Sequence, residues 1–165
     1  DRFMFKLKVT YPTRGEEAAV VNRMAHPAPD TQALAVAKLS DILEARALLD
    51  RIYIDEKIVE YILDLVIATR PGQRGELSSR QSAAKLEKFD GLVSFGASPR
   101  ASIALALAAR GVALLAGRAY VLPQDVKEVA ADVLRHRIVL SYEAEAENID
   151  TDDIVNGLLG ELKTP

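Results

Sequence analysis

The amino-acid sequence predicts a mainly α-helical protein: a small helical bundle with a short two-stranded ribbon and one orphan N-terminal strand. Apolar residues recur at helical spacing in several segments, and residues that cap helices precede most of these segments. The extended stretches are few and short. Because 49% of the 165 residues are hydrophobic, the chain can fill a core, and wholesale disorder is excluded.

The N-terminal residues 2–10 alternate as a strand does, with Phe3, Phe5, Leu7 and Val9 on one face. A single strand cannot satisfy its own edges. It either pairs with a short strand further along or belongs to a sheet outside this sequence. We favour the second alternative and expect an orphan strand.

The first predicted helix starts at a T-x-x-E capping box, formed by Thr13 and Glu16. It runs for about three turns to Ala25. The proline-rich residues 26–30 then break the helical pattern.

Two further helices are predicted in residues 40–69, with Ser40 capping the first and Asp55 starting the second. Their apolar faces follow helical spacing: Ile42, Ala45, Leu49 and Ile52, then Ile58, Ile62, Leu65 and Val66. Residues 71–97 show no strong period and are rich in glycine and serine. We expect a long mobile or functional loop there, with one helical turn at 83–88.

The C-terminal part of the chain predicts the centre of the bundle. Ser98 and Pro99 begin a helix that is apolar almost all round, and Gly117 can end it. Two amphipathic helices follow, over 124–135 and from Thr151. Their apolar residues are Val126, Val129, Ala130 and Val133, then Ile154, Val155, Leu158, Leu159 and Leu162. The expected strands of the ribbon are 120–121 and 136–140.

Composition excludes several functional classes. The chain has no cysteine, so disulfides and thiolate chemistry are excluded, and its two histidines lie too far apart to suggest a zinc site. Residues 101–116 are apolar but fall short of the roughly 20 residues that span a bilayer. No signal-peptide pattern is visible at the start. We therefore expect a cytoplasmic protein with no membrane span and no metal of its own.

Charge is distributed unevenly along the chain. The net charge is −3, and residues 141–165 contain seven carboxylates against Lys163. No basic stripe interleaved with aromatic residues appears, which argues against a nucleic-acid partner. The segment 123–140 resembles part of a winged helix, but Lys127, Arg135 and Arg137 are too few for a basic recognition face.

Common catalytic motifs are absent from the sequence, including the glycine-rich loop that cradles a nucleotide's phosphates. The run Ile52–Glu56 ends in Asp-Glu and resembles the magnesium-binding strand of P-loop ATPases. Without that loop, we interpret Asp55 as the cap of the following helix and Glu56 as a residue of its first turn.

The strongest candidate site is the sequence SFGASPRA at residues 94–101. Ser98 and Pro99 set a helix start, where free N–H groups favour an anion. Arg100, in the first helical turn, opposes the helix dipole, and a phosphate beside its guanidinium would explain its place there. An ordinary surface arginine is the alternative. On chemistry alone, Arg2 is a weaker candidate.

Residues 94–140, which begin SFGASPRASIALALAARG, resemble the C-terminal lid of MoxR-type AAA+ ATPases. The opening DRFMFKLKVTYP resembles the end of their α/β core, and YIDEKIVEYILDLVIATR resembles the first part of the lid. The resemblance implies a remnant of the core in residues 1–30 and a helical lid in residues 31–165.

Intact members of that family are ATP-driven, chaperone-like proteins that form rings, commonly hexamers, and often work with a partner containing a von Willebrand factor A domain. The resemblance implies ATP and Mg²⁺ as cofactors. It implies that Arg2 is the arginine finger that acts on a neighbouring subunit's nucleotide. Arg100, preceded by Ser98 and Pro99, matches the sensor 2 arginine.

Two departures from the family pattern matter. The sequence contains no Walker A or Walker B motif, so we expect this chain alone to be inactive, and the loop before Gly96 is longer than usual in the family. The alternative is a stand-alone helical adaptor that docks through its acidic C-terminal helix.

Overall fold

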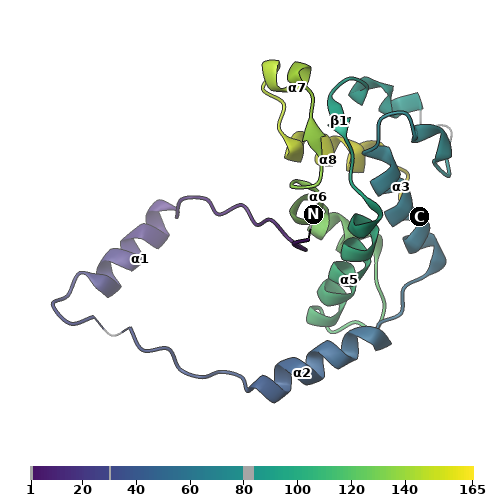
Figure 1. The fold of residues 1–165 in the computed structure, drawn as a ribbon. Coiled ribbons are helices and arrows are strands. Elements are labelled where there is room, and N and C mark those ends of the chain that lie inside the picture. The colour runs from purple at the N-terminus through teal and green to yellow at the C-terminus, as the bar shows by residue number, and fades with distance from the viewer. Residues whose placement is uncertain (1, 30, 80–83) are drawn as a thin grey trace.

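The helical prediction is confirmed in the computed structural model, which describes residues 2–29, 31–79 and 84–165 (Figure 1). A compact body contains the helices α3 (Glu56–Ala68), α5 (Pro99–Leu115), α6 (Pro123–Leu134), α7 (Tyr142–Ala146) and α8 (Thr151–Glu161), the 3-10 turns η1 (Leu49–Arg51), η2 (Arg74–Glu76) and η3 (Leu86–Phe89), and the strands β1 (Val93–Phe95) and β2 (Val139–Leu140). An arm, residues 11–48, carries α1 (Arg14–Met24) and α2 (Leu39–Leu48). The arm loops away from the body and returns to it after α2 (Figure 1).

Helix α5 lies at the centre of the body, where it packs against α3 and α6. Its buried face consists mostly of alanine, which lets neighbouring helices approach closely: Ala101, Ala104, Leu105, Ala108, Ala109 and Ala113. Gly117, with a positive φ of 69°, follows its end. Ile103 and Leu107 remain exposed on the other face. The helix is therefore central, as predicted, but it is not covered all round.

Helices α3, α6 and α8 bury the apolar faces that the sequence predicts. The buried residues include Ile58, Ile62, Leu65 and Val66 in α3, Val126, Val129, Ala130 and Val133 in α6, and Ile154, Val155 and Leu158 in α8. Because α8 turns these side chains into the core, its surface is mostly polar, and Leu159 is partly buried.

The predicted capping box of α1 is confirmed. The Thr13 N–H donates to Glu16 Oε2 at 2.7 Å, and the Glu16 N–H donates to Thr13 Oγ1 at 3.4 Å. The helix has no buried residue, so its local caps, rather than packing on the body, hold its start.

Two other predicted caps are wrong by one or two residues. Helix α2 begins after Lys38, whose N–H donates to the Asp41 carboxylate at 2.9 Å, and Ser40 lies inside the helix. Helix α8 is capped by Asp150, which accepts the Asp153 N–H at 2.8 Å, and Thr151 is its first residue. In both cases a nearby carboxylate satisfies a free N–H in place of the predicted hydroxyl.

The two-stranded ribbon is confirmed, but its predicted pairing is wrong. Strand β2 pairs antiparallel with β1, with Val93 opposite Leu140. Tyr120 instead forms an isolated parallel bridge with Tyr53, and the Val121 N–H donates to the Tyr53 carbonyl at 3.0 Å. The 12-residue helix α6 separates the two predicted partners by about 18 Å of helix, which keeps them at opposite ends.

The expected long loop at residues 71–97 is largely a packed segment, which corrects the prediction. Its apolar side chains enter the core: Leu77, Leu86, Phe89, Val93 and Ala97 are buried. Short 3-10 turns connect them, and such turns give no helical period in the sequence. The helical turn expected at 83–88 is found as η3, and Ala83 itself lies outside the described residues.

Arg74 ties this packed segment to the body. Its Nε donates to the Ala68 carbonyl at 3.2 Å and its Nη1 to the Leu86 carbonyl at 2.7 Å, and it also pairs with the Asp90 carboxylate. Helix α7, which the sequence did not predict, follows a Ser141 cap in the acidic C-terminal region.

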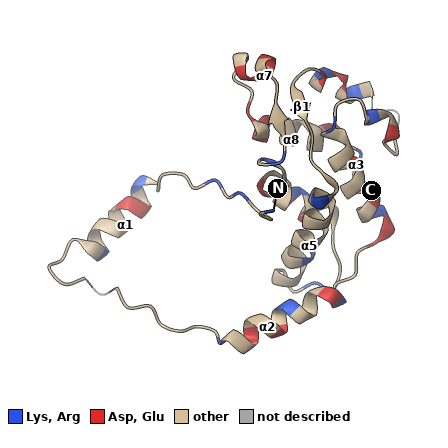
Figure 2. Ribbon diagram, in the orientation of Figure 1, with Lys and Arg blue, Asp and Glu red and all other residues tan. Residues whose placement is uncertain are grey.

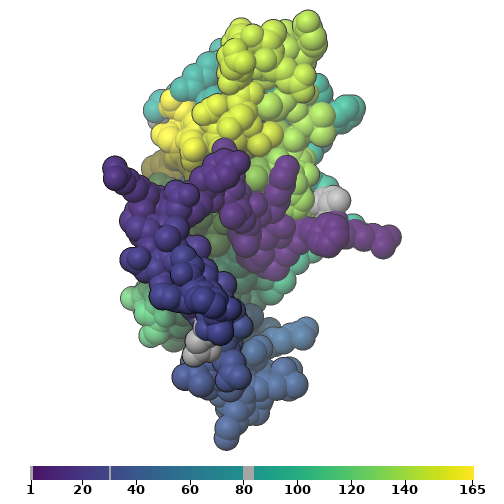
Figure 3. Space-filling model, turned by 90° about the vertical axis from the view of Figure 1, so that its left-hand side faces the viewer, coloured from purple at the N-terminus to yellow at the C-terminus, as the bar shows by residue number. Residues whose placement is uncertain are grey.

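Among residues 11–29 and 31–48, which the structure describes, no side chain is fully buried. Figure 3, which views the molecule from the side of the arm, shows this segment standing in front of the body. Within the described parts of the chain, no helix is long and apolar enough to cross a membrane. The predicted domain boundary between residues 30 and 31 stays a prediction.

Candidate functional site

A hollow of about 360 Å³ lies between the start of α5 and the N-terminal segment, residues 2–10. Its lining combines three arginines with apolar side chains: Arg2, Met4, Arg100, Ile103, Ala104, Leu107 and Arg137. None of these residues is a carboxylate. Figure 2 shows Lys and Arg residues where the N-terminal segment meets α5. The hollow therefore has the charge and chemistry of an anion site.

The structure brings together the two arginines that the sequence singles out. Arg2 and Arg100 are far apart in the sequence, yet both line this hollow. Among the residues that the structure describes, neither side chain makes a hydrogen bond or an ion pair. Both guanidinium groups are therefore available to an external anion.

The start of α5 sits where the sequence predicts it. Ser98 occupies the N-cap position with extended backbone (φ −76°, ψ 170°), Pro99 is the first helical residue and Arg100 the second. This arrangement directs the free N–H groups of the first turn and the Arg100 charge to the same end of the helix.

The turn before α5 is held against the end of α3. A Cβ on Gly96 would collide with the Thr69 carbonyl oxygen, and it would lie 2.7 Å from the Cα of Arg70. The Ala97 N–H donates to Thr69 Oγ1 at 2.9 Å, and Arg70 Nε donates to the Ala97 carbonyl at 2.9 Å. Only glycine permits this approach, which sets the position of the helix start.

Sequence reasoning missed the third arginine of the hollow. Arg137 follows α6 and is only 8% exposed, and its Nη2 donates to the Phe3 carbonyl at 2.7 Å. His136 Nε2 lies 2.9 Å from the same oxygen. Burial, and then the positive charge of Arg100, lower the pKa of Arg137. No local motif marks this residue, because its role depends on contacts with the other end of the chain.

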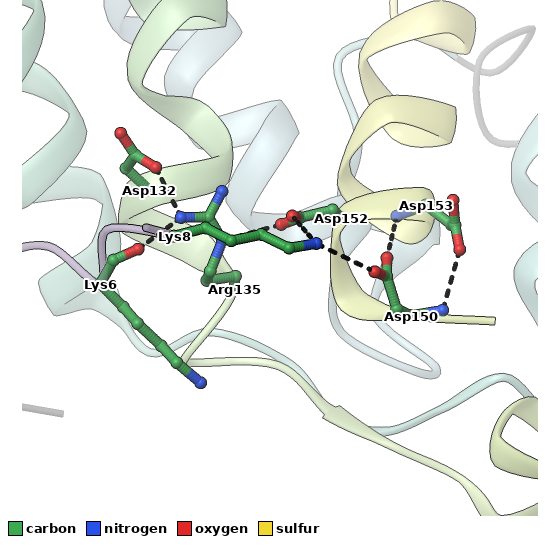
Figure 4. Close-up of polar contacts among 7 residues, drawn as sticks. All are labelled: Lys6, Lys8, Asp132, Arg135, Asp150, Asp152 and Asp153. Atoms are coloured by element: carbon green, nitrogen blue, oxygen red, sulfur yellow. Dashed lines mark hydrogen bonds and ion pairs between the residues drawn. The ribbon is translucent and has the colours of Figure 1, made fainter. Parts of the chain in front are cut away.

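Ion pairs dock the N-terminal segment on the body, as Figure 4 shows. Arg135 pairs with Asp132 at 2.6 Å and with Asp152 at 2.8 Å, and it also donates to the Lys6 carbonyl. The Lys6 N–H donates to the Asp132 carbonyl at 2.8 Å. Lys8 lies 3.6 Å from Asp152. These contacts direct the segment that carries Arg2 toward the hollow.

Asp150 shows the electrostatic effect of this docking. The hydrogen bond from the Asp153 N–H lowers the pKa of Asp150, and the charge of Lys8, 3.7 Å away, lowers it further. The carboxylate is thus stabilised in its charged form, both as a helix cap and as a partner for the N-terminal segment.

The Asp55-Glu56 pair has the structural role that we expected from the sequence. Asp55 is the N-cap of α3 and accepts the Lys57 N–H at 3.0 Å, and Glu56 lies in the first turn. The run Ile52–Glu56 forms no buried strand that ends at a phosphate site.

Comparison with known families defines the class of the protein. Residues 90–158 match the AAA lid domain family, so this part of the chain is an AAA lid domain. The match covers the ribbon, α5, α6 and most of α8.

Three relatives extend this assignment to the rest of the chain. Chaperone MoxR1 of Mycobacterium tuberculosis is 39% identical over all of this chain, which covers 41% of that protein. YeaC of Bacillus subtilis is 34% identical over all of this chain and 46% of its own length. Protein MoxR of Paracoccus denitrificans is 35% identical over 89% of this chain and 44% of its own length.

A solved structure agrees with the sequence relatives. The crystal structure of a candidate ATPase from Cytophaga hutchinsonii matches 99% of this chain and 47% of its own, with a TM-score of 0.86 and 38% identity. The chain is therefore a MoxR-type AAA+ relative, which confirms the family resemblance. It spans less than half the length of the curated relatives that it matches.

Proposed function

We propose that this chain is the C-terminal lid portion of an ATP-hydrolysing MoxR-type AAA+ ring protein. In this proposal, ATP binding and hydrolysis in the ring are coupled through the lid to chaperone-like remodelling of partner proteins. The observation that carries it is the shared hollow, which both Arg2 and Arg100 line and whose lining, among the described residues, includes no carboxylate.

The chemistry of the hollow fits a nucleotide's phosphates. A guanidinium offers a planar fork of N–H donors that matches phosphate oxygens and keeps its charge at all physiological pH values. Arg2 would act as the arginine finger and would stabilise the charge that develops on the transferred phosphoryl group. Arg100 would act as sensor 2, with Ser98 and Pro99 presenting the helix start to the same group.

The remaining parts of the site would come from elsewhere. This chain has no phosphate-binding glycine-rich loop, so a Walker A loop, a Walker B strand and their Mg²⁺ would have to be supplied outside it. We therefore propose that the chain alone does not hydrolyse ATP. The proposed partners are other subunits of the ring, a hexamer in the family pattern, and a protein with a von Willebrand factor A domain, in the cytoplasm.

Replacement of the two arginines in the intact protein tests this proposal. We expect Arg2→Ala to reduce ATP turnover by about 1,000-fold, the lower range for arginine fingers, and Arg100→Ala by about 100-fold. Both variants should keep the far-UV circular dichroism and melting temperature of the wild type, because neither side chain has a partner within the described structure. Arg23→Ala, on the exposed helix α1, is the matched control.

Wild-type turnover in both Arg2→Ala and Arg100→Ala would refute the assignment of the site. A second measurement, calorimetric titration of the 165-residue chain with ATP, should detect no micromolar binding. Micromolar binding would show that this chain holds a complete nucleotide site by itself. The phosphates would then bind somewhere other than the hollow lined by Arg2 and Arg100.

A further inference from the structure

Arg135 lies where α6, α8 and the N-terminal segment, residues 2–10, meet (Figure 4). Its Nη1 donates to Asp132 Oδ1 in α6 at 2.6 Å, and its Nε donates to Asp152 Oδ1 in α8 at 2.8 Å. Its Nη1 also donates to the Lys6 carbonyl. One guanidinium, 11% exposed, therefore joins two helices of the lid to the backbone of the N-terminal segment.

Lys6 is held through its backbone and not through its side chain. Its N–H donates to the Asp132 carbonyl at 2.8 Å, and its own carbonyl accepts from Arg135. The Lys6 residue itself is exposed. Arg2 is four residues away, a span of at most about 14 Å of chain. The position of the Lys6 backbone therefore limits where the Arg2 guanidinium can lie.

The same corner of the lid is connected to Arg100. Helix α6 ends at Arg135 and packs along α5, whose first turn carries Arg100. A movement of the α5–α6 pair would carry Asp132 and Arg135 with it, and these two residues hold Lys6. The two arginines of the hollow are thus linked through α5, α6 and the Arg135 guanidinium.

We propose that Arg135 is a positioning residue for Arg2: it fixes the N-terminal segment to the corner between α6 and α8, so that the orientation of the lid sets where Arg2 stands relative to a bound phosphate. This inference rests on the proposed function, in which Arg2 is the arginine finger, and adds a regulation of that site. Arg135 itself binds no phosphate, because its donors already serve two carboxylates and a carbonyl. Its hydrogen bond to Asp152 raises the pKa of Arg135, as such a tie does.

Substitutions in the intact protein separate positioning from stability. Arg135→Ala removes all three contacts, and we expect kcat for ATP to fall by about 100-fold, the cost of misplacing a reacting group by about 1 Å. The KM for ATP should stay within about twofold of the wild type, because ground-state binding is unchanged. Arg135→Lys keeps the charge beside both carboxylates but loses the planar fork, and its kcat should fall by about tenfold.

Arg118→Ala is the matched control. Arg118 Nη1 donates to the Tyr120 carbonyl at 3.0 Å and to Asp125 Oδ2 at 2.9 Å, and both partners belong to the lid and not to the N-terminal segment. We expect this variant to lower the melting temperature and to keep the wild-type kcat. All rates are compared at a temperature below the lowest melting transition, so that loss of fold does not count as loss of kcat.

Combination with Arg2→Ala gives the decisive test. If Arg135 acts through Arg2, adding Arg135→Ala to Arg2→Ala should change kcat by less than about threefold, whereas independent effects would multiply. Multiplied losses, or wild-type kcat in Arg135→Ala alone, would overturn the inference. Should Arg135→Ala not fold, Arg135→Lys with and without Arg2→Ala decides by the same criterion.

Failure of this inference is distinguishable from failure of the proposed function. Reduced turnover in Arg2→Ala together with wild-type kcat in Arg135→Ala would remove only the positioning role. Wild-type turnover in both Arg2→Ala and Arg100→Ala would refute the site itself, and the positioning role with it.

Discussion

At the scale of single residues, the position of Arg100 depends on Gly96. The chain passes so close to the end of α3 at Gly96 that a side chain would meet backbone atoms, which cannot rotate away. The adjoining hydrogen bond from the Ala97 N–H to Thr69 then fixes where α5 begins. One residue without a side chain thus sets the geometry of the candidate site.

We expect Gly96→Ala to destabilise the protein by about 1–3 kcal/mol, because the added methyl group forces a backbone shift. The matched control is Gly111→Ala in the interior of α5, where a Cβ meets nothing within 4 Å. That change should stabilise the protein by about 0.5–1 kcal/mol through helix propensity. Urea denaturation measures both values, and a neutral or stabilising Gly96→Ala would contradict the close approach that we describe.

At the scale of elements, the segment 71–97 shows how a stretch without periodicity becomes part of the core. Its 3-10 turns place Leu86 and Phe89 inside, and Arg74 holds them there through two backbone carbonyls. The Arg74 side chain is 10% exposed, whereas that of its partner Asp90 is 63% exposed. The two hydrogen bonds from Arg74 to backbone carbonyls are more buried than the ion pair. They should therefore contribute more to the free energy of unfolding than the ion pair does.

Substitution of each partner tests this ranking. Arg74→Ala leaves two buried carbonyls without their charged donor, and we expect it to lower the free energy of unfolding by about 3 kcal/mol. Asp90→Asn removes only a largely solvated charge, and we expect a loss below about 1 kcal/mol. Chemical denaturation compares the two variants, and equal losses would show that the ion pair holds the segment instead.

At the scale of the whole molecule, carboxylates join distant parts of the chain and make its stability depend on pH. Burial raises the pKa of Asp125, but hydrogen bonds from Arg118 and from the Leu122 N–H outweigh it, so the pKa lies below its ordinary value of 3.8. A hydrogen bond from Lys88 lowers the pKa of Glu161, which joins η3 to α8. The Asp153 N–H does the same for Asp150.

Since these pKa values are lower in the folded state, their stabilisation is complete above the ordinary values of 3.8 for Asp and 4.5 for Glu. This stabilisation is lost as the pH falls through the lowered pKa values of the folded state. We expect the free energy of unfolding to decrease below about pH 4. Asp150→Asn, which keeps a capping side chain, should be less stable than the wild type at pH 7. Its free energy of unfolding should decrease less toward acid pH, because one titrating carboxylate is gone. Denaturation at several pH values measures this.

The control for the pH experiment is Glu17→Gln on the exposed helix α1. It should leave the pH dependence unchanged. A parallel decrease in the wild type and in Asp150→Asn would show that Asp150 does not contribute, and that other carboxylates dominate the acid response.

The sequence by itself determined the features that arise from neighbouring residues. The helices, the capping box at Thr13, the cap at Asp55 and the start of α5 at Ser98 depend on spacing and on contacts within a few residues, so local pattern predicts them. The family resemblance likewise rests on contiguous motifs, such as the one that contains Arg100.

Only the tertiary structure decided the features that depend on residues far apart in the chain. It paired β2 with β1 instead of with residues 120–121, and it packed the segment 71–97 into the core. It also brought Arg2, Arg100 and Arg137 to one hollow. The physical reason is that burial and long-range hydrogen bonds depend on how whole helices pack, and α6 must be in place before Arg137 can reach the carbonyl of Phe3.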